Sequence, residues 1–412
     1  MKEIISSLDI GSSTVKLVVG EIYKNELNVL AVSEVKSKGV KKGIIVNPEE
    51  TLISLKEVFS RCQEMLDIKI NKVVLVIPSY YAEYLVSEAK CSISNEDGLV
   101  TNDDVLKVLQ NCVYDKVPSN KEFVSVMPIE FYIDESDKGV KDPKGMKAST
   151  LSCKSVLSLA PKKNVYTAVS LLENIGVSIV DINFGSVADY YEFKNDKLDK
   201  KNTAVINIGE EKTEVGIFKK GILVESENIE IGAKSIERDI CYIYDIDRKT
   251  AKKLKEKFAL ANKRNASSTW CEDVLTNKEE NIKINQYEIS EIISSRLKEI
   301  LNLSRKQINL LTKMEISSII ITGGTTELND FNLVVDEVFA HEMEIYKVKE
   351  MGCRHNKYSS SLGMIKYYHD KLSFRNKVAS TVDVESQEEL INNRKSNNSS
   401  ILGKIYGYFF NN

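Results

Sequence analysis

The chain has 412 residues, more than one compact hydrophobic core accommodates, so we expect two or more domains. Its 57 basic and 60 acidic residues leave a formal net charge of −3, which argues against a nucleic-acid partner. The seven cysteines are scattered and form no CxxC pair, a pattern typical of free thiols in a reducing compartment.

The first predicted motif, near the N-terminus, is a strand, a tight turn and a second strand. Gly11 tolerates backbone angles that other residues resist, and Ser12 and Ser13 offer hydroxyls and closely spaced N–H groups. Such a turn can hold phosphate oxygens, and Lys16 adds positive charge. Asp9, at the end of the strand, is suited to hold Mg²⁺ through water. The alternative is an ordinary hairpin whose polar residues face solvent.

The next segments alternate between strands and helices. Asn47 is a predicted N-cap for a helix that begins at Pro48, and the apolar run 73–77 is typical of a buried strand. Residues 81–160 differ in character and resemble a small inserted α+β unit. Its predicted strands cover 84–86, 122–126, 128–133 and 151–159, and its helix opens at Thr101; a helix over 162–175 and a strand over 177–182 follow.

A second strand–turn–strand motif covers residues 203–218 and repeats the first, which suggests an internal duplication. Asn207 and Gly209 stand at its turn, and Thr213 opens the following strand. Beyond it, we expect a helical region from Gly232, a Lys-rich helix over 251–261, a polar loop over 262–280 and a long amphipathic helix over 289–311.

A third turn follows a buried strand that begins at Ser318. Gly323 and Gly324 let the backbone approach a ligand closely, and Thr325 follows them. We expect that ligand to be an adenosine and its phosphates, with Leu328 on the following helix. The last helix of the globular part is predicted from Ser360.

Three turns, Asp9–Lys16, Asn207–Thr213 and Gly323–Thr325, match the order and spacing of the superfamily of actin, hexokinase and heat-shock chaperone ATPases. Within it, the chain resembles the bacterial cell-division family FtsA over about residues 1–370. Further family-like segments are residues 142–146, Gly232 with Asp239, and the pair Leu362-Gly363.

The resemblance implies an α/β protein with a duplicated actin-like (RNase H-like) ATPase fold and an inserted α+β subdomain. It also implies a disordered C-terminal linker that ends in an amphipathic helix. The expected units are 1–80 plus 161–199 and 200–231 plus 316–370 (actin-like subdomains), 81–160 (insert), 232–315 (helical subdomain), 371–397 (linker) and 398–412 (membrane-targeting helix).

The same resemblance implies ATP and Mg²⁺ as cofactors, and it assigns the residues of the site. The first phosphate loop would hold Asp9, Gly11, Ser12, Ser13 and Lys16; the adenosine-side loop would hold Gly323, Gly324 and Thr325; Lys255 would lie beside the base.

The second phosphate loop departs from the family pattern of an Asp followed by Gly-Gly-Gly-Thr. Here Asn207 replaces the Asp, and Glu210, Glu211 and Lys212 follow Gly209, although Thr213 is retained. Two carboxylates therefore stand where bare backbone would meet the phosphates. Repulsion between two like charges 4 Å apart costs on the order of 4 kcal/mol at an effective dielectric constant near 20. Either Lys212 offsets that repulsion or the glutamates point outward. We therefore expect ATP binding without significant catalysis; the alternative is a loop that has become only structural.

The C-terminal tail carries a second functional signal. Residues 371–400 are polar with few apolar side chains, as in a disordered linker. The following segment is weakly basic, and on a helix its apolar residues share one face that a bilayer interface would order. FtsA-type proteins end in such an anchor; the alternative is a tail that docks on its own domain or a partner. The predicted membrane-binding residues are Ile401, Leu402, Lys404, Ile405, Tyr408 and Phe409.

The resemblance implies a peripheral membrane protein that acts in cell division. Such a protein would tether the tubulin-like FtsZ ring to the cytoplasmic face of the cell membrane at the division site. It would also recruit later division proteins to the septum and self-associate into filaments or oligomers. Two alternatives remain: an actin-fold assembly scaffold similar to the pilus protein PilM, and a catalytic ATPase of the heat-shock chaperone or sugar-kinase type.

Overall fold

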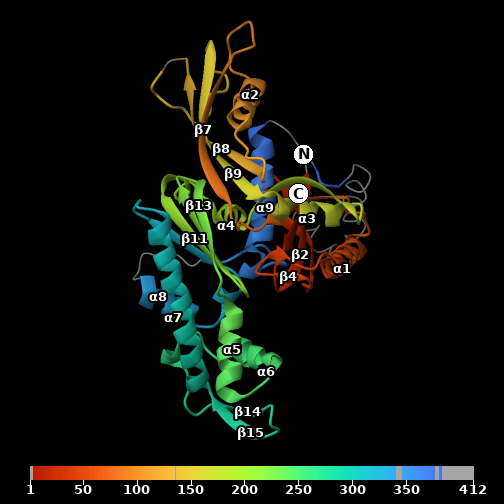
Figure 1. The fold of residues 1–412 in the computed structure, drawn as a ribbon, viewed down its shortest axis with the longest axis vertical. Helices are drawn as coiled ribbons and strands as arrows, with labels where there is room; N and C mark the ends of the chain where they lie inside the picture. The colour runs from red at the N-terminus through yellow and green to blue at the C-terminus, as the bar shows by residue number, and fades with distance from the viewer. Residues whose placement is uncertain (1–2, 135, 340–345, 376–379, 383–412) are drawn as a thin grey trace, which may run out of the picture.

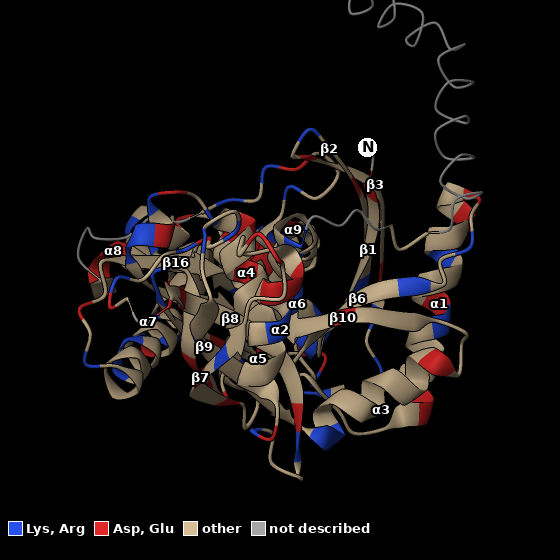
Figure 2. Cartoon of the chain, turned by 90° about the horizontal axis from the view of Figure 1, so that it is seen from above, with Lys and Arg blue, Asp and Glu red and all other residues tan. Residues whose placement is uncertain are grey.

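The computed structural model describes residues 3–134, 136–339, 346–375 and 380–382. This part of the chain is elongated, with a small three-stranded unit at one end (Figure 1). At the other end lies a hairpin of β14 (Cys271–Leu275) and β15 (Asn281–Asn285). Two larger sheets lie between these ends, and acidic and basic residues are intermixed over the helices around them (Figure 2).

The first sheet has the strand order β10-β6-β1-β2-β3. β1 pairs antiparallel with β2 and parallel with β6, which in turn pairs parallel with β10. Helices pack against this sheet. Nearly all residues of β1 and β6 are therefore buried, instead of alternating between buried and exposed positions. The strands are β1 (Glu3–Ile10), β2 (Thr14–Tyr23), β3 (Glu26–Lys36), β6 (Lys72–Ile77) and β10 (Ser178–Phe184).

The second sheet, β13-β12-β11-β16, repeats this arrangement. β11 pairs antiparallel with β12 and parallel with β16, as β1 does with β2 and β6. The predicted duplication is therefore present in the strand pairing. The strands are β11 (Asn202–Ile208), β12 (Thr213–Lys219), β13 (Ile222–Ile229) and β16 (Ser318–Thr322). We call the elements around the first and second sheets the first half and the second half.

The small unit has its own hydrophobic core and contains β7 (Glu83–Ser92), β8 (Lys121–Ile133), β9 (Thr150–Pro161) and α2 (Asn102–Val113). Thr101 caps α2 with Asp104 in a reciprocal capping box, as its sequence position predicts. The two strand segments predicted around Pro128 form the single strand β8. The pairing shifts register there, because a proline cannot donate a ladder hydrogen bond.

The remaining helices cover the sheets and the cleft between them. They are α1 (Pro48–Leu66), α3 (Lys162–Glu173), α4 (Gly185–Phe193), α5 (Ala233–Tyr244), α6 (Arg248–Lys257), α7 (Gln286–Leu311), α8 (Phe331–Phe339) and α9 (Ser359–Phe374). Two-residue strands β4 (Val40–Lys41) and β5 (Ile44–Ile45) form a small hairpin. No helix in the described ranges is long and apolar enough to span a membrane.

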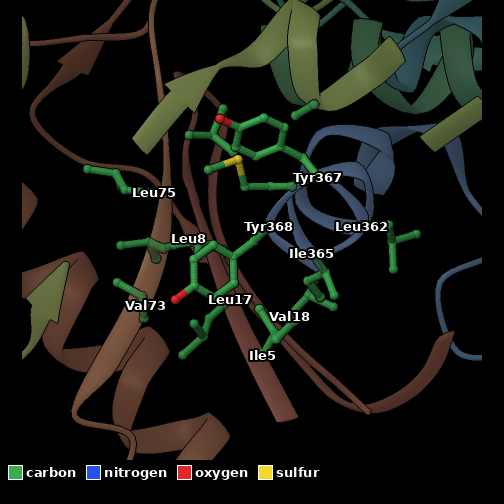
Figure 3. Close-up of a cluster of buried hydrophobic side chains, with 14 of the residues drawn as sticks. Ile5, Leu8, Leu17, Val18, Val73, Leu75, Leu362, Ile365, Tyr367 and Tyr368 are labelled. Carbon is green, nitrogen blue, oxygen red and sulfur yellow. The ribbon is translucent and has the colours of Figure 1, made fainter. Parts of the chain in front are cut away.

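Helices α4 and α9 cross at the centre of the molecule (Figure 1). A Cβ atom on Gly363 would lie 1.7 Å from the carbonyl oxygen of Ala188, so only glycine permits this approach. From the crossing, α9 sends Ile365, Tyr367 and Tyr368 into the core of the first sheet (Figure 3). The glycine of the family-like pair thus has a packing role.

Several element boundaries differ from the predicted ones. The expected polar loop 262–280 contains β14, whose single buried residue, Val274, gives no alternating pattern to recognise. The Lys-rich helix ends at Lys257 rather than 261. Leu328 follows a 3₁₀ turn instead of lying on a helix.

The segment expected as a linker from residue 371 begins in ordered structure. α9 continues to Phe374, and residues 380–382 lie against β1. Thr381 N donates to Ile4 O at 2.8 Å, and Thr381 Oγ1 accepts from Ser6 N at 2.7 Å. β6 pairs with β1 only from Ser7 onward, so this end of β1 has backbone groups that need partners.

The helix crossing gives a stability prediction. Gly363→Ala forces α4 and α9 apart, so we expect the free energy of unfolding to fall by about 3 kcal/mol. Urea unfolding measures it. Ser373→Ala, at an exposed position of the same helix, is the control and should change stability by less than about 0.5 kcal/mol. Equal stability of the two variants would contradict the role of the close contact.

Candidate functional site

A cavity of about 570 Å³ lies between the two halves, where three turns converge. β11 and β16 run parallel with Asn207 opposite Thr322, so their carboxyl ends open at the same edge. All predicted nucleotide-binding residues except Thr213 line the cavity. They are Asp9, Gly11, Ser12, Ser13, Lys16, Asn207, Gly209, Lys255, Gly323, Gly324 and Thr325.

The first turn is held by contacts along its hairpin. Asp9 and Lys16 stand directly opposite each other on β1 and β2, and their side chains form an ion pair of 2.8 Å. Gly11 N donates to Thr14 O at 3.1 Å, which closes the turn. Ser12 Oγ accepts a hydrogen bond of 2.7 Å from Gly43 N, and so ties the turn to the β4–β5 hairpin.

In the second turn, both inserted glutamates line the cavity and have cationic partners. Glu210 pairs with Arg248, and Glu211 pairs with Lys234. Burial raises the pKa of Glu211, but the hydrogen bonds from Lys234 and from Lys42 N outweigh burial and hold this pKa below its usual range. Both glutamates are therefore paired, although with these cations and not with Lys212.

Lys212 and Thr213 have other partners. Lys212 Nζ lies 2.9 Å from Glu214 Oε2. Thr213 is fully buried in β12 and its hydroxyl donates to Ile231 O at 2.8 Å, so its side chain lies away from the cavity. Thr213 was predicted to bind nucleotide, and the structure does not bring it to the other site residues.

Lys255 reaches the cavity from α6. Its ammonium is buried and lies 2.7 Å from Glu237 Oε1. Burial raises the pKa of Glu237, and the charges of Lys255 and Arg248 more than reverse the shift. Lys255 therefore arrives at the cavity as part of an ion pair.

The third turn needs its first glycine for two reasons. Gly323 has a φ of +97°, and a Cβ there would lie 2.5 Å from Ile208 O. At Gly324, in contrast, a Cβ would make ordinary contacts with Lys357 and His355. The bare face of Gly324 therefore leaves room in the cavity and is not required by the backbone.

Asp189, a fully buried residue of α4, was not among the predicted site residues. Its carboxylate accepts hydrogen bonds from Asn207 Nδ2 at 2.6 Å, Ser359 Oγ at 2.6 Å and Ser360 Oγ at 2.8 Å. Burial raises the pKa of Asp189 to about 6 against these hydrogen bonds. A signal existed in the sequence, because one acidic residue interrupts the apolar and aromatic run 187–191. The carboxylate of Asp189 thus contacts Asn207, which lines the cavity, but is not itself part of the cavity lining.

The donor set bears on the expected metal. Within the described residues, no group of three or more acidic, His or Cys side chains is placed to hold a metal ion. Mg²⁺ commonly binds through one or two carboxylates plus substrate phosphates, and Asp9 remains the predicted water-mediated contact. These side chains fit an ion that enters with phosphates and do not form an all-protein cage.

The predicted membrane-binding residues, 401–409, lie outside the described residues.

Comparison with known proteins decides the family. Residues 204–363 match the family model described as "Cell division protein FtsA", and residues 80–157 match the model described as "SHS2 domain inserted in FTSA". The chain belongs to the FtsA family. It is an actin-like cell-division protein, and the small unit with β7, β8, β9 and α2 is the insert of this family.

Relatives named "Cell division protein FtsA" are similar to most of the chain. The one from Bacillus subtilis is 26% identical over 374 residues, which cover 89% of this chain and 83% of the relative. The one from Enterococcus hirae is 24% identical over 363 residues, which cover 87% of this chain and 82% of the relative.

Solved structures show the same fold at low identity. A chain of the "PilM-PilN type IV pilus biogenesis complex" superposes with a TM-score of 0.57 and 13% identity, over 87% of this chain and 97% of that one. MreB5 of Spiroplasma citri, solved bound to ADP, gives a TM-score of 0.54 and 16% identity, over 91% and 98%. These similarities confirm the predicted actin-like fold of the FtsA-family chain.

The buried carboxyl of α4 gives a pH prediction. The folded pKa of Asp189 exceeds the ordinary value of about 3.9, so the folded protein holds this proton more tightly than the unfolded chain does. Asp189 therefore destabilises the fold progressively as the pH rises from about 4 to about 6. Asp189→Asn removes this titration. Its stability relative to the wild type should improve by on the order of 3 kcal/mol across that range.

Urea unfolding of both proteins at several pH values measures this difference. Ser373→Ala, at an exposed position and without a titratable group, is the control and should show a pH-independent difference from the wild type. The same flat result for Asp189→Asn would show that the buried carboxyl keeps an ordinary pKa.

Proposed function

We propose that this FtsA-family protein tethers the FtsZ ring to the cytoplasmic face of the cell membrane at the division site and recruits later division proteins. The observation that carries the proposal is the joint match of an FtsA core and its inserted domain in one chain. The insert separates this family from other actin-like proteins, and it offers a surface for self-association into filaments or oligomers.

Nucleotide binding is the second part of the proposal. Three turns converge on one cavity, whose residues include the predicted phosphate-loop and adenosine-side residues. The similar MreB5 structures were solved bound to ADP and to AMPPNP. ATP would place its phosphates between the turns at Gly11 and Gly209 and its adenosine beside Gly324. Asp9 would hold Mg²⁺ through water, and the ion would offset the negative charge of the phosphates.

The site is poorly suited to hydrolysis. Asn207 provides no negative charge, and its amide nitrogen is already engaged by Asp189. We therefore assign ATP a role in the conformation of a scaffold. A PilM-like assembly scaffold is the second candidate, because the chain of the PilM-PilN complex superposes with a TM-score of 0.57. Membrane attachment through the tail distinguishes the membrane tether from this scaffold.

Gly324→Val tests the nucleotide site. A side chain there fits among Lys357 and His355 but enters the cavity, so it should displace the adenosine without disturbing the fold. Calorimetric titration with ATP and Mg²⁺ should give a micromolar dissociation constant for the wild type. The variant should bind at least about tenfold more weakly, a loss of about 1.4 kcal/mol. Thermal unfolding of the variant without nucleotide is the control, and equal affinities would contradict this placement of ATP.

Removing residues 398–412 tests the membrane tether. Full-length protein should sediment with vesicles that contain anionic lipid and should carry purified FtsZ with it. The truncated chain should stay in the supernatant while still binding FtsZ in solution. Burial of a few large apolar side chains contributes roughly 1.5–3 kcal/mol each, enough for reversible attachment.

Substitution of Ile405 and Phe409 by Ser is the matched control, because it keeps the chain length and the charge. This variant should also stay in the supernatant, since it removes only the apolar side chains. Vesicle binding by the truncated protein would exclude the tail as the anchor and favour the scaffold alternative.

A further inference from the structure

Two residues of the altered second phosphate loop, Glu211 and Lys212, reach across the cleft. Glu211 lies between β11 and β12, and its Oε2 accepts a hydrogen bond of 2.8 Å from Lys42 N in the β4–β5 hairpin. Its other carboxylate oxygen pairs with Lys234 of α5. One carboxylate therefore joins the first half to the second half.

The β4–β5 hairpin is in turn fixed to the first phosphate loop through Gly43 N and Ser12 Oγ. Lys42 and Gly43 both have positive φ, of 51° and 80°, so the hairpin turn presents its backbone N–H groups in a tight bend. Ser12, Gly43 and Glu211 all line the cavity. The two phosphate loops are thus connected at the phosphate end of the cavity.

Lys212 makes a second connection beside the first. Its Cε lies 3.4 Å from the position of a Cβ on Gly43, and its ammonium is 5.0 Å from the centre of the Tyr80 ring. The ammonium also donates to Asn228 Oδ1 at 2.6 Å, while Asn228 Nδ2 donates to Ser79 Oγ at 3.0 Å. Lys212 therefore packs on the first half while it is anchored in the second.

These contacts are shielded from water. The side chains of Glu211 and Lys212 are 16% and 17% exposed. Charge-assisted hydrogen bonds in such surroundings are stronger than exposed ion pairs, such as the one between Lys42 and Glu230 at the rim. Glu210, in contrast, pairs with Arg248 within the second half.

We propose that Glu211 and Lys212, with Lys42 and Gly43, form an interdomain clasp that controls entry and exit of nucleotide at the phosphate end of the cavity. The contacts of Glu211 and Lys212 with the first half support the existence of the clasp. Its control of nucleotide exchange rests on the proposed nucleotide binding. The departure from the family pattern then has a positive role: it replaces a loop that only cradles phosphates by one that also holds the halves together.

Hydrogen–deuterium exchange of the full-length protein tests the clasp without nucleotide. In the wild type, the Lys42 amide is protected by Glu211, so the peptide over 38–47 should exchange slowly. Glu211→Ala should speed exchange there by at least about tenfold, the effect of losing a hydrogen bond to a charged group. Glu210→Ala is the matched control, because it removes the same charge from the same loop, and should leave this peptide unchanged. Equal rates in wild type and Glu211→Ala would overturn the clasp.

The dissociation of a fluorescent N-methylanthraniloyl-ATP, chased by excess unlabelled ATP, tests the control of exchange. Glu211→Ala should release the probe at least about tenfold faster than the wild type. Glu211→Gln keeps an acceptor for Lys42 N and should be intermediate, and Ser373→Ala, at an exposed position outside the cavity, should release at the wild-type rate.

The two failures are distinguishable. Probe that binds the wild type and leaves all proteins at one rate would overturn the control of exchange but leave ATP binding intact. Absence of probe binding by the wild type would overturn the proposed nucleotide function, and the control of exchange with it. The exchange measurement would then still decide whether the clasp exists.

Discussion

The architecture depends on the contact between α4 and α9, where Gly363 lies against the backbone of Ala188. The crossing sets the depth at which α9 enters the core of the first sheet, and it also places the first turn of α9 beside the second phosphate loop. Asp189, the next residue of α4, then accepts hydrogen bonds from β11 and from Ser359 and Ser360. The packing of α9 on the first sheet and the hydrogen bonds of Asp189 at the cleft therefore both depend on the close contact between Gly363 and Ala188.

The charges around the cavity follow a consistent rule: no carboxylate at the phosphate turns is left without a donor. Asp9 has Lys16, Glu210 has Arg248 and Glu211 has Lys234. Burying an unpaired carboxylate is costly, so a loop that gains glutamates must gain partners with them. Those partners come from α5, α6 and the β4–β5 hairpin, which draws separate elements toward the second loop.

Local patterns in the sequence predicted the elements that depend on local chemistry. The strand–glycine–strand turns, the Asn47 and Thr101 caps and the buried strand before Gly323 are readable because adjacent residues create them. The hydrogen-bond partners of Glu211 and Asp189 were not predictable, since these bonds join residues that are 169 and 18 positions apart in the sequence. Thr213 matches the family pattern in sequence, yet strand alternation turns its hydroxyl toward Ile231. Motif identity alone cannot report side-chain direction.

The second phosphate loop shows how a binding motif can change without loss of the fold around it. Strand pairing between β11, β12 and β16 depends on backbone hydrogen bonds and buried apolar residues, which the loop substitutions leave untouched. The loop is therefore free to exchange glycines for charged residues, provided that each charge finds a partner. In this chain, two of the three new side chains find partners or packing surfaces in the first half. A turn whose family pattern suits phosphates thus also makes a structural contact between the two halves of this actin-like protein.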